Sequence, residues 1–198
     1  MLCLSGANAL STFRQEQLLK HLRSVDTLFQ AVEARYVYFI QLDPDSADHP
    51  NVDPVVLQRL CRLLQADEQY LEPESGWQVS VVPRLGTRSA WSSKATDIAR
   101  RCGMDQVLRI ERGIQYLFSD PDLQSLSEAG KGQAEALLHD RMTESVIDLS
   151  TDLDGLFSVA EPAPLVSIPV LEEGRLALEE HNREMGLALS SDELDYLE

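Results

Sequence analysis

The sequence predicts an α+β fold, a two-layer sandwich in which helices cover a largely antiparallel sheet. Three observations predict it. Segments with apolar residues at helical spacing alternate with short β-branched and aromatic segments up to about residue 147. The 198 residues, 43% of them hydrophobic, suffice for a core without disulfides or metal. The order strand, helix, strand, helix occurs twice, which indicates two similar fused halves.

In the first half, a short apolar segment precedes a long helix that we expect over residues 11–34, with Ser11 as its N-cap. The β-branched and aromatic residues of 35–42 predict a strand, which Asp43 and the proline after it bring to an end. A second helix is expected over 53–65, because apolar residues recur there every three or four positions. These elements complete the first predicted half.

The second half repeats this order. Alternating apolar residues predict a strand over 77–82, and a helix is expected over 94–102, where a glycine follows it. Residues 106–118 predict one long strand or two broken ones, with Gly113 marking a bulge. A fourth helix is expected over 133–147, which has leucines at helical spacing.

Beyond this point the composition divides the chain into further regions. Residues 1–147 are predicted to form an N-terminal domain, and 148–170 an acidic linker whose prolines disfavour long helices. A short strand is expected at 165–170. Residues 171–198 are predicted to be the start of a helical domain.

The helical region contains two signals. An amphipathic helix is expected over 171–185, with Gly186 as its stop. Ser190 and Glu193 then have the spacing of a capping box. Only five residues follow that box, whereas an isolated helix needs roughly 12–15 residues to be stable. We therefore expect the chain to be cut inside a larger protein.

The charge excludes some classes of function. The chain has 33 Asp and Glu against 17 Lys and Arg, a net charge of −16, and 19 of the acidic residues lie in 119–198. This excess disfavours binding to nucleic acid and to anionic membrane surfaces. The sequence has neither a transmembrane run nor a signal-peptide pattern. Its three cysteines show no CxxC spacing, so we expect reduced thiols and a cytoplasmic protein.

The most unusual tract is 83–97, which connects a predicted strand to a predicted helix. Its candidate interdomain contacts are hydroxyl-bearing, cationic or aromatic: Arg84, Thr87, Trp91, Ser92, Ser93 and Lys94. Because a helix start offers free N–H groups, the tract could bind phosphate or carboxylate, although it lacks the glycine spacing of nucleotide-binding loops. Alternatively, Ser92 or Ser93 caps the helix, the cations form surface or interdomain pairs, and Trp91 anchors against another surface.

A second polar cluster, residues 139–144, falls on the predicted fourth helix, where Asp140 and Glu144 would share a face. Residue Thr143 stands one turn after His139, so the His spacing of zinc helices is absent and a local polar network is favoured over a metal site. Neither a nucleophile elbow nor a local Cys–His pattern occurs. We expect no catalytic, cofactor-binding or metal-binding residue in this chain.

Three tracts carry a resemblance to a known family. They are 83–99 with its continuation at 102–103 and 109–113, then 138–144, and finally 174–197. The first two strongly resemble the N-terminal domain of the large form of phosphoribosylformylglycinamidine synthase. The third is similar to the linker domain that follows it in that family. The match covers essentially the whole chain in the family's order.

The resemblance implies a multidomain ligase of purine biosynthesis. That enzyme uses ATP, Mg²⁺ and glutamine to convert formylglycinamide ribonucleotide into formylglycinamidine ribonucleotide, and ammonia passes from its glutaminase domain to its synthetase domain. Its N-terminal domain is similar to two fused copies of a small subunit of the split enzyme, which agrees with the two predicted halves. The family's nucleotide-binding and nucleophilic residues lie beyond residue 198, so we expect this segment alone to be inactive.

The resemblance also implies a role for the segment. Residues 1–147 would scaffold the glutaminase and synthetase domains of the same polypeptide. The cations and Trp91 of the 84–97 loop lead to the hypothesis that this loop is the contact surface. No cofactor is expected in this segment, whereas the whole enzyme uses ATP and Mg²⁺. The alternative is a free-standing α+β module that binds a small anionic metabolite at the 84–97 loop.

Overall fold

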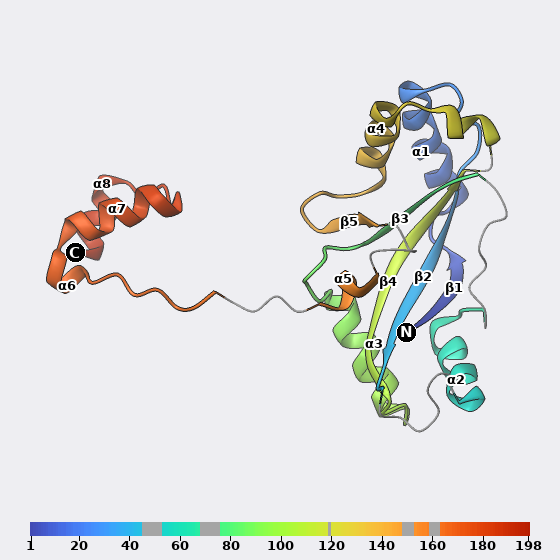
Figure 1. The fold of residues 1–198 in the computed structure, drawn as a ribbon, viewed down its shortest axis with the longest axis horizontal. Helices are drawn as coiled ribbons and strands as arrows, with labels where there is room; N and C mark the ends of the chain where they lie inside the picture. The colour runs from blue at the N-terminus through green and yellow to red at the C-terminus, as the bar shows by residue number, and fades with distance from the viewer. Residues whose placement is uncertain (45–52, 68–75, 119, 148–152, 159–162) are drawn as a thin grey trace. The chain divides into compact units, whose positions relative to one another are not determined.

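The computed structural model describes the chain except for residues 45–52, 68–75, 119, 148–152 and 159–162 (Figure 1). It divides into two compact units, 1–160 and 161–198, and each is described by itself. None of the described helices has the length and apolar character needed to cross a membrane.

Among the described residues, five strands form one antiparallel sheet, with the order β1-β2-β4-β3-β5. Their bounds are β1 (Leu2–Asn8), β2 (Glu33–Leu42), β3 (Trp77–Pro83), β4 (Val107–Phe118) and β5 (Glu144–Ile147). The central pair is long, since β2 and β4 stay paired from Glu33 opposite Leu117 to Leu42 opposite Val107. The predicted α+β sandwich with an antiparallel sheet is confirmed.

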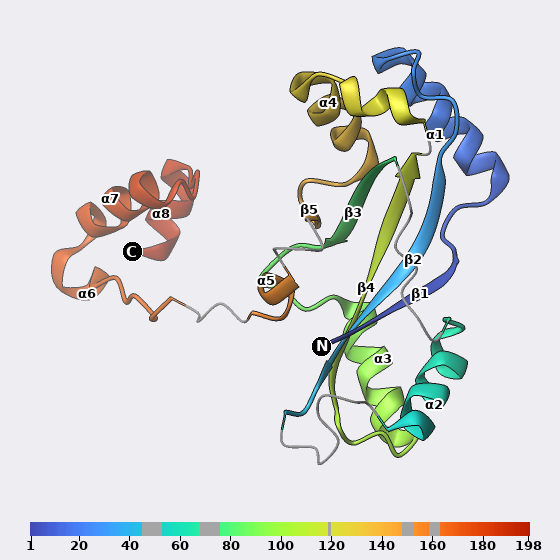
Figure 2. The same ribbon diagram turned by 45° about the vertical axis from the view of Figure 1, so that its right-hand side comes forward.

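Most helices of this unit lie at the two ends of the sheet, whereas the short α5 (Leu153–Phe157) lies near its middle (Figures 1 and 2). The others are α1 (Thr12–Val25), α2 (Pro54–Leu64), α3 (Ala90–Arg101), the 3₁₀ turn η1 (Pro121–Ser125) and α4 (Glu128–Leu138). Helices α1 and α4 pack together at one end, and α2 and α3 cover the other. The order β1-α1-β2-α2 thus recurs as β3-α3-β4-α4, which agrees with two fused halves.

Two apolar clusters fill the space between the sheet and its helices. Ile40 and Ile110 pack with α2 and α3, whereas Tyr116 and Phe118 pack with α1 and α4. A third cluster lies on the opposite face of the sheet, where Leu156 of α5 is fully buried. The residues alternate between faces because successive side chains of a strand point to opposite sides.

The first predicted helix is too long. It begins after its N-cap Ser11 as expected, but α1 ends at Val25, nine residues before the predicted end. The Asp26 carboxylate accepts a hydrogen bond from the Leu28 N–H, which turns the chain out of the helix. Phe29 is nevertheless fully buried. It is apolar because it belongs to the core, and not because it lies on a helix.

The fourth predicted helix, 133–147, is confirmed only for residues 133–138 and is wrong beyond them. Helix α4 starts five residues earlier, at Glu128 after its N-cap Ser127, and ends at Leu138. The Asp140 carboxylate accepts a hydrogen bond from the Met142 N–H in a turn, and the chain then forms β5. The β-branched residues of 144–147 pair with β3, so sheet hydrogen bonds replace the helix predicted from leucine spacing.

The remaining elements of this unit agree more closely. Helix α2, strand β3 and a single unbroken β4 lie where 53–65, 77–82 and 106–118 predict them. Gly113 marks no bulge, because its pairing with Val37 is regular. A Cβ there would instead lie 2.6 Å from the Val81 carbonyl oxygen, so the glycine permits close approach of two strands.

The segment expected to be a linker, 148–170, contains α5, whose buried Leu156 belongs to the first unit. Residues 163–169 form no regular structure, so the strand expected at 165–170 is wrong where the structure describes it. Val170 instead begins a helix. The predicted linker residues at 148–152 and 159–162 lie outside the described part of the chain.

The regular structure of the second unit is helical within its described residues. Its elements are α6 (Val170–Glu173), α7 (Arg175–Met185) and α8 (Ser191–Leu197). The single helix expected over 171–185 is broken at Gly174, where φ is +66°. Gly186 ends α7 as predicted. The capping box is confirmed, because Ser190 and Glu193 satisfy each other's backbone N–H groups.

Candidate functional site

The loop that leaves β3 is held in a defined turn. The Arg84 N–H donates to the Thr143 carbonyl oxygen at 2.9 Å, which ties the loop to the turn before β5. Both the backbone N–H and the hydroxyl of Thr87 donate to the Arg84 carbonyl oxygen. Gly86, with φ at +76°, supplies the left-handed residue that this turn requires.

Ser89 caps α3, so the expectation of a cap at Ser92 or Ser93 is wrong. The Ser89 hydroxyl oxygen accepts from the Ser92 N–H at 3.0 Å and the hydroxyl donates to a carboxylate oxygen of Glu111 at 2.9 Å. Helix α3 therefore begins at Ala90, four residues before the prediction. The partner that selects Ser89 lies 22 residues away in sequence, on β4.

A buried ion pair fixes this arrangement. Arg109 and Glu111 are 4% and 0% exposed, and two guanidinium nitrogens of Arg109 donate to one Glu111 oxygen at 3.0 and 2.6 Å. Arg109 also donates to the Thr87 carbonyl oxygen at 2.6 Å, and its guanidinium lies 5.4 Å from the ring centroid of Phe157 in α5. The loop after β3 is thus bound to β4 through Arg109 and Glu111.

This ion pair bears on the anion-binding alternative. The start of a helix attracts negative charge through its free N–H groups. At α3 that charge is the protein's own, because Glu111 accepts from both the N–H and the hydroxyl of Ser89. Glu111 also neutralises Arg109, so two of the features that would bind a small anion here already have an internal partner.

On the other face of β4, a cluster of aromatic rings surrounds Arg112. We define the Arg112 cluster as Tyr36, Tyr38, Trp91 and Arg112. The Arg112 guanidinium carbon lies 4.4 Å from the ring centroid of Tyr36 and 4.8 Å from that of Trp91. Trp91 stacks on Tyr38 with centroids 5.9 Å apart. Gly6 of β1 makes room, since a Cβ there would lie 2.6 Å from the Tyr38 ring.

Burial perturbs one titratable group of this cluster. Tyr38 is 6% exposed, and its burial raises the pKa of the phenol because the ionised form loses hydration. The positive charge of Arg112 opposes that rise by favouring the phenolate, and the neighbouring Tyr36 adds to it. The Tyr38 phenol is therefore neutral at physiological pH and acts here as an apolar platform.

The six predicted contact residues are not equally available. Arg84, Thr87, Ser93 and Lys94 are exposed, and they lie on the loop or the first turns of α3. Trp91 is half-buried, lies on the helix and contacts its own sheet. Ser92 is fully buried, and its hydroxyl has no hydrogen-bond partner among the described residues.

Sequence reasoning missed two cations at this place. Arg88 is exposed on the loop beside the predicted residues. Arg112 is half-buried, on a strand one residue after the Arg109–Glu111 pair. The alternation of β4 could have found it, because a residue at an even position faces away from Arg109 and Glu111 and toward α3.

The polar cluster at 139–144 is a turn rather than a helical face. The Asp140 N–H donates to a Glu144 carboxylate oxygen at 2.9 Å, and the Glu144 N–H donates to the Asp140 carbonyl oxygen at 2.7 Å. His139 contacts the Glu135 carbonyl oxygen through Nδ1 at 2.6 Å. These bonds make the local polar network, and within the described residues no group of three His, Cys, Asp or Glu side chains is placed to hold a metal ion.

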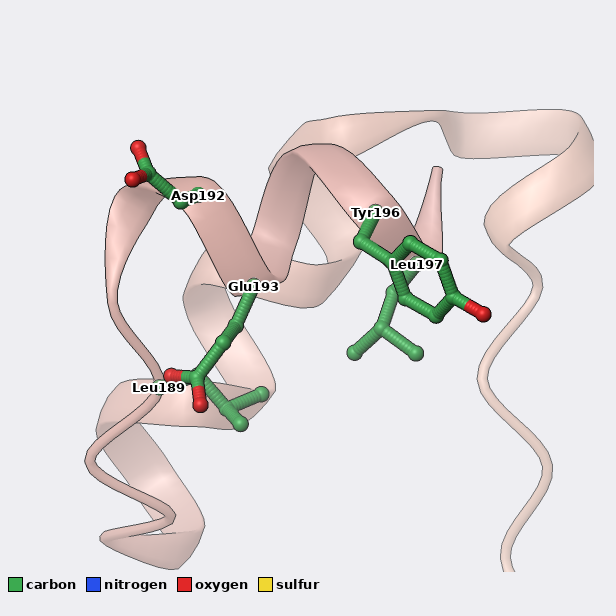
Figure 3. Close-up of a pocket in the computed structure, with 5 residues that line it drawn as sticks. All are labelled: Leu189, Asp192, Glu193, Tyr196 and Leu197. Atoms are coloured by element: carbon green, nitrogen blue, oxygen red, sulfur yellow. The ribbon is translucent and has the colours of Figure 1, made fainter.

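The second unit has a shallow groove of about 320 Å³ on α8 (Figure 3). Its lining is mostly apolar: Leu189, Asp192, Glu193, Tyr196 and Leu197. Tyr196 is 89% exposed, and Glu193 is engaged in the capping box. Hydrogen bonds from Ser190 lower the pKa of the Glu193 carboxyl.

One comparison with known proteins bears on identity. A family model described as formylglycinamide ribonucleotide amidotransferase N-terminal matches residues 35–157. The matched region is more than half of the chain and runs from β2 through α5. It includes the buried ion pair, the loop after β3 and all four members of the Arg112 cluster.

Proposed function

The chain belongs to the family of formylglycinamide ribonucleotide amidotransferase N-terminal domains, and from this premise we propose that it serves as a non-catalytic scaffold. In this proposal it holds the glutaminase and synthetase domains of a purine-biosynthesis enzyme in register. It thereby supports the transfer of ammonia between them. The enzyme would be an ATP-dependent ligase of the cytoplasm.

One observation carries the scaffold role. The buried Arg109–Glu111 pair holds the backbone of the loop after β3 in place. The side chains of Arg84, Arg88 and Lys94, on this loop and the start of α3, are exposed. Within the described part of the chain, none of these three side chains makes an ion pair or hydrogen bond. A rigid backbone with unpaired cations favours contact with another protein surface, since little conformational entropy is lost on binding.

In this proposal, catalysis belongs to other domains of the enzyme. The buried pair that looks most like active-site chemistry is already satisfied internally, because Arg109 and Ser89 each donate hydrogen bonds to Glu111. ATP and Mg²⁺ would be bound by the synthetase domain. The segment of 198 residues alone would be inactive.

The test replaces Arg84 and Lys94 together by Ala in the full-length enzyme. We expect glutamine-dependent turnover to fall by about tenfold or more, as for the loss of interfacial charge contacts, while turnover with added ammonia stays within about twofold. Added ammonia bypasses the glutaminase. A variant that impairs only the docking of the glutaminase domain therefore keeps its ammonia-dependent turnover. Trp91 is left intact because it packs on Tyr38 and its loss would disturb the fold.

One control variant accompanies this test. Arg14→Ala removes an exposed cation from α1, at the other end of the sheet, and should leave both activities unchanged. Equal loss of both activities in the Arg84 and Lys94 variant would contradict the docking role.

The alternative, a module that binds a small anionic metabolite, is tested by calorimetry of the 198-residue chain with nucleotides and phosphosugars. We expect no heat of binding, because Glu111 occupies the start of α3. Micromolar binding that is lost in the Arg84 and Lys94 variant would favour the metabolite-binding module over the scaffold.

A further inference from the structure

Arg112 differs from the other ordered arginine of β4. Arg109, three residues earlier, is buried and paired with Glu111. Arg112 is half-buried, lies between the rings of Tyr36 and Trp91, and makes no ion pair or hydrogen bond among the described residues. Two rings order its guanidinium but leave its N–H donors without an acceptor, and guanidinium donors match a carboxylate in a two-pronged geometry.

The Arg112 cluster lies at the middle of the helix-covered face. Along β4, Ile110 packs with α2 and α3, and Tyr116 packs with α1 and α4, so Arg112 falls between the two helix pairs. Tyr36, Trp91 and Arg112 are each partly exposed. The cluster is therefore reachable from solvent, although its Tyr38 base is buried.

A second cation stands beside the cluster. Lys94 follows Trp91 by three positions on α3, so the two side chains are neighbours on the helix surface. Lys94 is exposed and makes no ion pair within the described residues. The acidic residue one turn further, Asp97, is paired with Arg101 at 3.1 Å. Two cations and two aromatic rings thus share one patch.

We propose that the Arg112 cluster and Lys94 bind an acidic segment of a partner domain, a refinement that rests on the proposed scaffold function. Trp, Tyr and Arg are the residues that contribute most to the affinity of protein interfaces. The patch is cationic although the net charge of the chain is −16, and its positive charge is complementary to a segment rich in carboxylates. A phosphate ligand is disfavoured, because Glu111 fills the adjacent helix start.

Zero-length cross-linking of amines to carboxylates tests this proposal in the full-length enzyme. The chain has three lysines, Lys20, Lys94 and Lys131, so each cross-link is readily assigned by mass spectrometry. We expect Lys94 to join an Asp or Glu outside residues 1–198, and Lys20 on α1 to form no such link. Lys94 links confined to this chain's own carboxylates would overturn the proposal.

Two variants of Arg112 separate recognition from folding. Arg112→Gln should lower the yield of the Lys94 cross-link by about tenfold, as expected for loss of one charge partner at an interface. Arg112→Lys keeps the charge and adds an amine, so it should itself cross-link to the same acidic segment. If residue 112 reaches no external carboxylate in the folded Arg112→Lys variant, the proposal is wrong.

Failure of carboxylate recognition by the Arg112 cluster can be distinguished from failure of the proposed scaffold function. Intact mass of the native gene product comes first, because a product near 22.1 kDa contradicts membership of a larger polypeptide. A cross-link from Lys94 to a separate acidic protein would then still support recognition of a carboxylate segment. Protection of Lys94 by added inorganic phosphate, with no cross-link to protein, would point instead to a metabolite site and overturn the proposal.

Discussion

The two units of the chain differ in how far they bury their apolar side chains. In the first, Leu22, Phe29 and Phe118 are 0 to 1% exposed, in the core between the sheet and its helices. In the second, Leu171 and Tyr196 are 100% and 89% exposed. The first unit completes a core with its own residues, whereas the described residues of the second bury few apolar side chains beyond Ala177, Leu178 and Leu194.

The difference shows that helices can be specified without a core. In the second unit, α7 ends at a left-handed Gly186 and α8 begins at the Ser190 box, and both signals act within a few residues. In the first unit, packing overrides local signals, as at Phe29 and the start of α3. We expect core substitutions to separate the two units more clearly than any other change.

The largest expected effect comes from Phe29→Ala. Its ring is fully buried and lies 5.4 Å from Phe118 and 6.1 Å from Trp77, centroid to centroid, so truncation should lower the free energy of unfolding by about 4 kcal/mol. The matched change Leu176→Ala, in the second unit and 76% exposed, should cost less than about 0.5 kcal/mol. Urea denaturation measures both, and similar losses would contradict the comparison.

Next is the contrast between two ion pairs. Glu111→Gln leaves the Arg109 charge buried without a counter-charge and should cost about 3 kcal/mol. Asp195→Asn breaks the exposed Arg175–Asp195 pair of the second unit and should cost below about 0.5 kcal/mol. Thermal unfolding of the two isosteric variants checks this, and a stable Glu111→Gln protein would show that the buried pair does not anchor the loop.

A smaller effect is expected at the helix caps. Ser190→Ala should destabilise α8 by about 1 kcal/mol, visible as faster amide exchange in that helix. Hydrogen bonds from the backbone N–H and then the hydroxyl of Ser190 lower the pKa of Glu193, so this variant, which removes only the hydroxyl, should raise that pKa part of the way toward its ordinary value. The support that Glu193 gives to α8 is present above that ordinary pKa and is lost as pH falls through the lowered pKa. Ser127→Ala, which uncaps α4, is the matched change in the first unit.

The smallest effect at neutral pH is expected for Tyr116→Phe. Burial, with help from Glu144 and Tyr36, raises the pKa of Tyr116 from 10.0 to about 12. A raised pKa favours folding below pH 10, and this contribution is lost as the pH rises from 10 to 12. Phe at this position should remove the last step of the ultraviolet tyrosine titration and reduce the loss of stability in that window.

The sequence predicted most elements of the fold, but few of the features that depend on contacts between residues far apart in the chain. The Ser190 box and the Gly186 stop were predictable because each involves residues a few positions apart. The cap at Ser89 was not, because its partner Glu111 lies 22 positions away. The helix predicted at 133–147 failed beyond residue 138 for the same reason, since pairing with β3 decides the structure of 144–147.

The candidate site follows the same division. The tract 83–97 stands out in the sequence by its composition, and the structure does place a loop and a helix start there. Arg112 could be located on a strand but not assigned to the rings of Tyr36 and Trp91, because three separate elements bring these residues together. A period-two pattern gives the face of a side chain and not its neighbours.

The tie between the loop and β4 has a kinetic consequence. Moving the backbone at Thr87 would remove one hydrogen-bond acceptor from the buried Arg109 guanidinium, so we expect large excursions of the loop to be rare. If the proposed partner binds here, it would meet a surface already held in place, and association would need no slow rearrangement step. We expect its rate to be governed by diffusion and ionic strength, and to fall as added salt screens the cations.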